Sequence, residues 1–238
     1  MKLFAAPDTA EAARRAAEAV AAVLRQPGRP TLVLSTGKTM VPVYRELVRL
    51  HRARRAPFVR ALAFQVDELV GSGLSRKSFR AFLERHLLDK VRVSGSRRRF
   101  FDGQAPDPDA ECARYERELA RAGGADLLIL GLGANGHVAY LEPGRSLAPR
   151  TSRVVLSTET RRGLAAQGLK PPPRHALTMG IETILSARRV LLVAFGRSKA
   201  RAVARALSGR VTPRCPASYL TLHPRLTIIL DREAASKL

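Results

Sequence analysis

The chain has 238 residues, with 42 lysines and arginines against 20 aspartates and glutamates, a formal net charge of +22 and only two cysteines. It has no run of 18 apolar residues, no apolar stretch of signal-peptide type at its start and too few cysteines for a disulfide framework, so a transmembrane or disulfide-rich protein is excluded and a cytoplasmic location is expected. Its positive charge is mostly arginine spread along the whole chain without interleaved aromatics, which favours an anionic small molecule over nucleic acid or a membrane as partner.

Apolar runs and helical spacings alternate along the chain. In chain order, they predict a helix over residues 9–25, a strand over 31–35, a helix over 39–51, a strand over 61–66, helices over 78–90 and 107–122, a strand over 125–130, a helix over 179–185, a strand over 190–195, a helix over 198–207 and a strand over 226–230. The alternation predicts an α/β fold, a single three-layer domain over residues 1–238 with a mostly parallel, Rossmann-like sheet and helices on both faces. The least structured segment, residues 161–174, ends in three prolines and is expected to be a loop or lid within about residues 158–175.

Ligands of open parallel sheets bind beyond the carboxyl ends of the strands, so the residues that follow each strand are the candidate site. The first predicted strand leads into a helix through a turn with hydroxyls, a glycine and free amides, which is a good seat for a phosphate: Ser35, Thr36, Gly37, Lys38 and Thr39. A nucleotide-binding P-loop would need a glycine at position 32, where the chain has leucine. An ordinary helix cap is the alternative for this turn.

Two further strand ends carry charged residues. Asp67 and Glu68 follow the second predicted strand, where one carboxylate can act as a general base or the pair can serve as a helix cap or in a salt bridge. Lys199 stands in the first turn of the helix predicted after residue 195. A cation is poorly placed for the helix dipole there unless it serves a bound anion.

Gly131, Gly133 and Gly136 have the G-x-G-x-x-G spacing of a dinucleotide-binding loop, but Pro143 and Gly144 interrupt the helix that this motif requires. His137 and Glu142 in the same loop favour an imidazole held by a carboxylate, an acid/base pair suited to neutral pH. Zinc binding lacks a third ligand at motif spacing. A histidine satisfied by backbone hydrogen bonds is the remaining alternative.

Six segments in this order resemble the family of glucosamine-6-phosphate deaminases, within the larger group that includes 6-phosphogluconolactonases, and the resemblance covers nearly the whole chain. The segments are residues 34–39, 66–71, 131–144, 176–181, 196–199 and 222–224. The resemblance implies a mechanism without metal or organic cofactor that converts glucosamine 6-phosphate into fructose 6-phosphate and ammonia in amino-sugar catabolism.

The resemblance also implies a role for each residue. His137, oriented by Glu142 and Asn135, would assist opening of the sugar ring, and Asp67 would move a proton from C2 to C1. Ser35 to Thr39 and Lys199 would hold the phosphate, with Glu68 and Gly136 in support. Glu142 followed by Pro143 is typical of deaminases, and Leu69 stands where lactonases carry arginine, so lactone hydrolysis is the second hypothesis and a non-catalytic sugar-phosphate-binding protein the third.

Some positions depart from the family pattern. Lys38 and Met40 replace a small residue and a proline in the phosphate loop, and Leu69 replaces a tyrosine. Ala166 stands nearest the position of the lid arginine, for which Arg161, Arg162 or Lys170 could substitute. Ser152 and Val154 replace basic allosteric residues, and the chain ends soon after Glu233, so a non-allosteric monomer or small homo-oligomer is expected.

Overall fold

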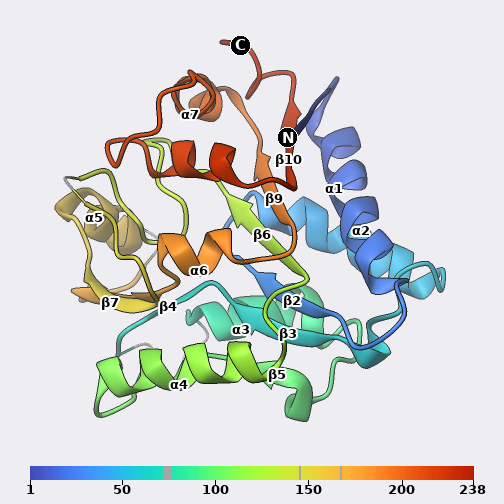
Figure 1. Ribbon diagram of the computed structural model, residues 1–238, viewed down its shortest axis with the longest axis horizontal. Helices are drawn as coiled ribbons and strands as arrows, with labels where there is room; N and C mark the ends of the chain where they lie inside the picture. The colour runs from blue at the N-terminus through green and yellow to red at the C-terminus, as the bar shows by residue number, and fades with distance from the viewer. Residues whose placement is uncertain (72–76, 145, 167) are drawn as a thin grey trace.

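The central strands are apolar on both faces, as strands covered from two sides must be. In the computed structural model, which describes residues 1–71, 77–144, 146–166 and 168–238, seven strands form one sheet (Figure 1). All neighbouring strands are parallel, in the order β1-β10-β9-β6-β2-β3-β5. Their bounds are Lys2–Ala6 for β1, Thr31–Leu34 for β2, Leu62–Gln65 for β3, Arg98–Arg99 for β5, Leu127–Gly131 for β6, Val190–Ala194 for β9 and Leu226–Asp231 for β10.

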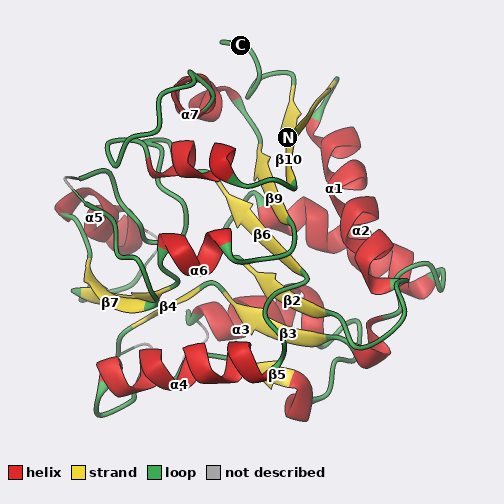
Figure 2. Ribbon diagram, viewed as in Figure 1, coloured by secondary structure: helices red, strands yellow, loops and turns green. Residues whose placement is uncertain are grey.

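Helices cover both faces of this sheet (Figure 2). Side chains of α1 (Thr9–Leu24), α2 (Met40–Arg52) and α3 (Phe79–Leu83) pack in the core on one face. Those of α4 (Pro108–Arg121), α6 (Ile181–Leu185) and α7 (Ala200–Ala206) pack on the other. The predicted three-layer α/β class is confirmed.

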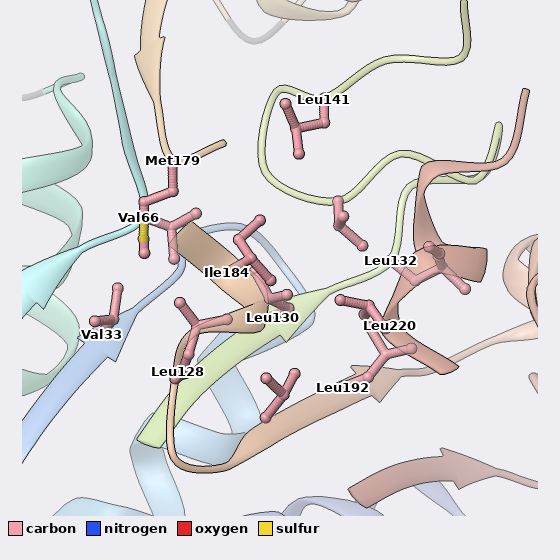
Figure 3. Packing of buried hydrophobic residues seen from close by; sticks show 14 of the residues in the cluster. Val33, Val66, Leu128, Leu130, Leu132, Leu141, Met179, Ile184, Leu192 and Leu220 are labelled. Carbon is pink, nitrogen blue, oxygen red and sulfur yellow. The ribbon is translucent and has the colours of Figure 1, made fainter. Parts of the chain in front are cut away.

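Strand β6 shows how the sequence produces the two cores. Successive side chains of a strand point to opposite faces, so Leu127 and Ile129 enter the core with α1 and α2, whereas Leu128 and Leu130 enter the core with α4 and α6. Figure 3 shows Leu128 and Leu130 beside Val33 of β2 and Leu192 of β9. A five-residue apolar run is therefore buried completely except at Gly131, where the strand leaves the sheet.

A second, smaller sheet was not predicted. Strands β4 (Asp67–Leu69), β8 (His175–Thr178) and β7 (Ser152–Val155) pair antiparallel in the order β4-β8-β7. Helix α5 (Thr158–Ala166) packs on it through Leu164, against Leu69 and Leu156. The first part of the segment that we expected to be a loop or lid is thus helical.

Two other local predictions differ from the structure. The predicted helix over residues 78–90 is α-helical only to Leu83 and continues as a π-helical turn, Glu84–Leu88, in which Asp89 N donates to Glu84 O. The edge strand β1 was missed because four of its five residues are exposed and do not form a buried-type apolar run. No helix in the described ranges has the length and apolarity needed to cross a membrane.

The strand order sets the position of the functional loops. From β2 the chain proceeds outward to β3 and β5, and then returns to β6 on the other side of β2. The order therefore reverses between β2 and β6, and such a switch point opens a crevice at the carboxyl ends of the strands. The loops at residues 35–39 and 131–142 leave from the two strands that flank this crevice.

Leu130→Ala is expected to lower the free energy of unfolding by about 2–5 kcal/mol, because Leu130 is 0% exposed and its removal leaves a cavity between sheet and helices. Leu222→Ala is the matched control. Leu222 is 60% exposed, and its truncation is expected to change the free energy by no more than about 0.5 kcal/mol. Urea denaturation measures both; equal losses in the two variants would contradict the assignment of the core.

Candidate functional site

The turn after β2 presents backbone amides at the crevice. The Ser35 hydroxyl donates to Ile129 O of β6 at 2.6 Å, and the buried Tyr44 hydroxyl donates to Ser35 O. Within the described parts of the chain, no acceptor is found for the amides of residues 36–39, and Thr39 makes no side-chain cap for α2. The alternative of an ordinary side-chain cap is therefore absent here. The turn keeps its amides available, with the Lys38 side chain in solvent.

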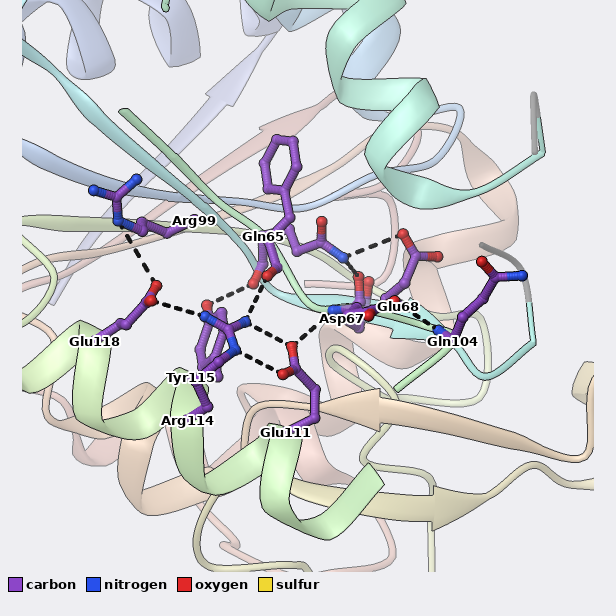
Figure 4. A network of polar contacts seen from close by, with 11 residues as sticks. Gln65, Asp67, Glu68, Arg99, Gln104, Glu111, Arg114, Tyr115 and Glu118 are labelled. Atoms are coloured by element: carbon purple, nitrogen blue, oxygen red, sulfur yellow. Dashed lines mark hydrogen bonds and ion pairs between the residues drawn. The ribbon is translucent and has the colours of Figure 1, made fainter. Parts of the chain in front are cut away.

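Glu68 and Asp67, adjacent on β4, have different surroundings (Figure 4). The Glu68 carboxylate accepts from the amides of Leu69 at 2.9 Å, Phe79 at 3.0 Å and Arg80 at 2.9 Å, so it holds the start of α3. Asp67 is only 7% exposed, and no group among the described residues donates to its carboxylate. Burial, with the charge of Glu68 as a smaller cause, raises the pKa of Asp67 to about 8.

His137 is held by its backbone. Its amide donates to Asn135 Oδ1 at 3.1 Å and its carbonyl accepts from Gly133 N at 2.9 Å. Burial lowers the pKa of the imidazole, against the opposing effect of the Glu142 carboxylate, so the ring is neutral at neutral pH. Nδ1 is buried and has no hydrogen-bond partner in the described structure. Backbone hydrogen bonds thus fix the loop and leave the ring unpaired.

Two of the glycines in this loop allow close approaches. A Cβ on Gly133 would lie 2.4 Å from the His137 ring, and one on Gly136, at φ +95°, would lie 2.9 Å from Cys215 Sγ. The loop then turns back through the pair Val138 and Leu141. The G-x-G-x-x-G spacing therefore serves to seat an imidazole, and no helix follows it.

Glu142 does not hydrogen-bond to His137 in this structure. Its Oε1 accepts from the Thr160 hydroxyl at 2.6 Å and from the Ser157 amide at 3.4 Å, both at the start of α5. Oε2 has no donor among the described residues. Likewise Asn135 contacts the backbone of His137 and not its ring. In this structure Asn135 contacts the backbone of the loop and Glu142 contacts the start of α5, so the orientation of the imidazole by these two side chains stays a prediction.

Lys199 completes the arrangement from β9. It lies in a short turn, Arg197–Lys199, before α7, and its side chain is half-buried. Burial lowers its pKa, and its charge contributes to the lowered pKa of His137. Asp231, which sequence reasoning missed, accepts from Gly196 N at 3.0 Å and supports this turn. Its position at the end of β10 is the signal that could have found it.

The residues of α5 and those that depart from the family pattern differ in how far they are buried. Arg161 is half-buried on α5, with an Nε atom that has no partner in the described structure, whereas Arg162, Ala166 and Lys170 are exposed. Leu69 is fully buried in the core of the small sheet. Among these candidates for the family's lid arginine, Arg161 is the one residue that is not exposed.

The surroundings of His137 do not supply the ligand set of a metal site. The ranges that the structure describes contain no group of three or more His, Cys, Asp or Glu side chains placed to hold a metal ion. The charged and polar groups at the crevice are instead an acid with a raised pKa, a neutral imidazole, a lysine and a turn of open amides. Such groups can bind an oxyanion and transfer protons.

Comparison with known proteins extends the likeness over the whole chain. A glucosamine-6-phosphate deaminase of Bacillus velezensis is 40% identical over 228 residues, covering 94% of this chain and 95% of the relative. One from Giardia intestinalis is 38% identical, covering 94% of this chain and 86% of its own.

Solved structures agree. A monomeric glucosamine-6-phosphate deaminase superposes with a TM-score of 0.96 at 36% identity, with 100% of both chains covered. The 6-phosphogluconolactonase of Trypanosoma brucei, at 21% identity and a TM-score of 0.78 over 100% of this chain and 98% of its own, shares the fold. Residues 7–228 match the family of glucosamine-6-phosphate isomerases and 6-phosphogluconolactonases. The chain belongs to that family.

Proposed function

We propose that the chain is a glucosamine-6-phosphate deaminase, which converts glucosamine 6-phosphate and water into fructose 6-phosphate and ammonia. The observation that carries the proposal is the pair of buried groups at one crevice, Asp67 with a raised pKa and His137 with a lowered one. Buried groups in one crevice whose surroundings shift their pKa values from the ordinary range are candidates for proton transfer. The deaminases that resemble the chain over its full length support the choice of substrate.

Phosphate binding is assigned to the turn after β2 and to Lys199. The amides of residues 36–39 lack acceptors in the described structure and can donate to phosphate oxygens, while Lys199 supplies a positive charge from the β9 side. The Ser35 hydroxyl is engaged with Ile129 O, so Ser35 acts by shaping the turn. The sugar then lies between this seat and the loop that carries His137.

Ring opening is assigned to His137. Its neutral imidazole takes the proton of the C1 hydroxyl and returns a proton to the ring oxygen, which breaks the bond between C1 and that oxygen and leaves an open-chain aldehyde. Burial keeps the ring uncharged, as a proton acceptor requires. Glu142, whose charge favours the protonated imidazole, stabilises the intermediate state of this transfer.

The isomerisation is assigned to Asp67. Its carboxylate takes the proton from C2, the electrons of that bond form a double bond between C1 and C2, and the electrons of the C1 carbonyl move to O1, which takes a proton from the ammonium group. The acid then returns its proton to C1, and the nitrogen lone pair forms the double bond to C2. C2 is then an imine, which water hydrolyses to the ketone with release of ammonia. A raised pKa strengthens Asp67 as a base, and the substrate's ammonium group, close to it, favours the ionised form.

The test is a comparison of two reactions on one preparation. Formation of ammonia and fructose 6-phosphate from glucosamine 6-phosphate is measured in parallel with hydrolysis of 6-phosphogluconolactone. Ammonia release with no lactonase activity is the expected result. Lactone hydrolysis without ammonia release would replace the proposal by the second hypothesis, and neither activity would favour a binding protein.

Asp67→Asn is expected to lower kcat by at least about 10²-fold, because an amide cannot accept the proton from C2.

The same variant is expected to be more stable than the parent at pH 8. The folded pKa of Asp67, about 8, lies above the unfolded value of about 3.9, so the parent loses stability as pH rises from about 4 to 8 and the variant does not. Thermal unfolding at pH 4 and pH 8 measures this difference; a variant that is less stable at both pH values would contradict it.

The pH dependence of kcat/KM is expected to show a rising limb near pH 8, because Asp67 of the free enzyme must lose its proton to act as base. Glu68→Gln is expected to shift this limb to lower pH, since the negative charge of Glu68 is one cause of the raised pKa. Glutamine retains an oxygen for the amides that start α3. An unchanged limb in this variant would exclude Asp67 as the titrating group.

Lys199→Ala is expected to lower kcat/KM by about 10- to 100-fold through loss of one charge-assisted hydrogen bond to the substrate phosphate. Arg197→Ala is the matched control, because Arg197 lies two residues away on the same turn with an exposed side chain. Steady-state kinetics with varied glucosamine 6-phosphate measures both. An equal loss in the two variants would point to general electrostatic attraction and not to a specific contact.

We also infer that the chain acts as a monomer of 26.0 kDa in the cytoplasm. The likeness to a monomeric deaminase supports the first inference, which light scattering tests. The buried, free thiols Cys112 and Cys215 suit a reducing compartment, which supports the second and which cell fractionation tests.

A further inference from the structure

A cavity of about 400 Å³ lies behind the loop that carries His137, outside the residues assigned above to substrate. It is lined by Arg205, Ser208, Arg210, Thr212, Arg214 and Cys215. These residues belong to the end of α7 and to the segment that leads into the 3-10 helix Pro216–Leu222. The cavity is large enough for a small metabolite.

Its three arginines lack acidic partners. Arg205, Arg210 and Arg214 take part in none of the ion pairs of the described structure. The sequence itself has no aspartate or glutamate between Glu182 and Asp231. By contrast, Arg98 and Arg114 each pair with two carboxylates. Positive charges around one cavity repel each other, and an anion between them would remove that cost.

The polar geometry suits a phosphate group. Arg205 Nη2 donates to Arg214 O at 2.6 Å, which joins the two sides of the cavity and holds this guanidinium in place. Thr212 Oγ1 accepts from Arg214 N at 3.3 Å, which leaves its hydroxyl hydrogen for a ligand. Planar guanidinium groups bind the oxygens of phosphate through paired hydrogen bonds, and the Thr212 hydroxyl can add a further donor.

The cavity contacts the catalytic loop from behind. Arg205 Nη1 donates to Asn135 O at 3.4 Å, and Ala217 N donates to Gly136 O at 3.0 Å. Gly136 also packs on Cys215, which lines the cavity. Asn135 and Gly136 directly precede His137, so a ligand that draws Arg205 away from Asn135 O alters the support of the imidazole.

In place of the non-allosteric behaviour expected from the sequence, we propose that this cavity binds a phosphate group, of free phosphate or of a small phosphate monoester, and that its occupancy changes the rate of the reaction at His137. The site is separate from the seat of the substrate phosphate, which is formed by residues 36–39 and Lys199. Binding to the cavity does not depend on the proposed deaminase activity. Its kinetic effect does.

Equilibrium dialysis with radiolabelled inorganic phosphate at constant ionic strength tests the binding. The wild-type chain is expected to bind two phosphates, one in each seat. Arg210→Ala with Arg214→Ala is expected to bind one, because loss of two charge-assisted hydrogen bonds weakens the cavity site by at least about tenfold. Lys199→Ala is expected to weaken the other phosphate and to leave the cavity phosphate bound.

The matched control is Arg225→Ala with Arg232→Ala. Both arginines are exposed, lie outside the cavity and form no ion pair in the described structure, so this pair removes the same net charge elsewhere. It is expected to keep two phosphates. An equal loss of bound phosphate in the two double variants would overturn the cavity site. So would a wild-type chain that binds a single phosphate, if Lys199→Ala weakens that phosphate. Arg210 and Arg214 are exposed, so truncating them is expected to leave the fold intact. Unchanged melting temperatures of the single variants Arg210→Ala and Arg214→Ala check this.

A kinetic comparison tests the effect on the reaction and separates the two sources of phosphate. Inorganic phosphate and glycerol 3-phosphate are each titrated against varied glucosamine 6-phosphate. In wild type the effective ligand is expected to change kcat as well as apparent KM, and in Arg210→Ala with Arg214→Ala to change apparent KM alone. An unchanged kcat in wild type with two phosphates bound would overturn the coupling. Absence of any activity would contradict the proposed function and leave the dialysis result standing.

Discussion

The hydrogen bond from the Ser35 hydroxyl to Ile129 O, at 2.6 Å, joins the two strands at which the sheet changes direction. Strands β2 and β6 are paired directly at only two positions, Leu32 with Leu127 and Val33 with Leu128, before their ends diverge into loops. The hydrogen bond from the Ser35 side chain links the two strands beyond their last paired positions. It therefore fixes how far apart the turn at residues 36–39 and the loop that carries His137 stand, and in the proposed function every contact of the substrate with both depends on that separation.

Near this junction, the burial of Asp67 lowers the stability of the folded protein. Burial raises the pKa of this carboxyl group, which is only 7% exposed. Glu68, one residue along the same strand, is stabilised by three backbone amides and secures the start of α3. Two identical types of group thus differ in role because one receives hydrogen bonds and the other does not.

The sequence predicts the parts of this arrangement that follow from local pattern. The apolar runs predict five of the seven strands of the central sheet, β2, β3, β6, β9 and β10, and the helical spacings predict its long helices, two of which begin at the caps Asp8 and Asp107 in the structure. The small antiparallel sheet escaped prediction because β4 and β7 carry charged or exposed residues, and because β4 is ordered by pairing with β8 across more than a hundred positions of sequence. Helix α5 has only one fully buried side chain, Leu164, so its amphipathic pattern is weak.

The candidate site, too, is predicted from the sequence in its single residues and not in the contacts between them. The residue types after the strand ends indicate an anion seat, a base and an imidazole, because each belongs to one continuous segment. The partners of these residues come from distant segments, as Thr160 does for Glu142 and Asp231 for Gly196. No spacing along the chain encodes such pairs, and they need the folded structure.

Glu142 is the place where these distant segments meet. The donors Ser157 N, just before α5, and the Thr160 hydroxyl, on α5, both use its Oε1, whereas Oε2 faces no donor in the described residues, and the imidazole of His137 has an unpaired Nδ1. A carboxylate has two equivalent acceptors, so one side chain can hold the lid with one oxygen and receive the imidazole N–H with the other. An amide of the same shape offers only one acceptor. The two-fold symmetry of a carboxylate thus allows a single residue to make the position of the lid and the tautomer of the histidine depend on each other.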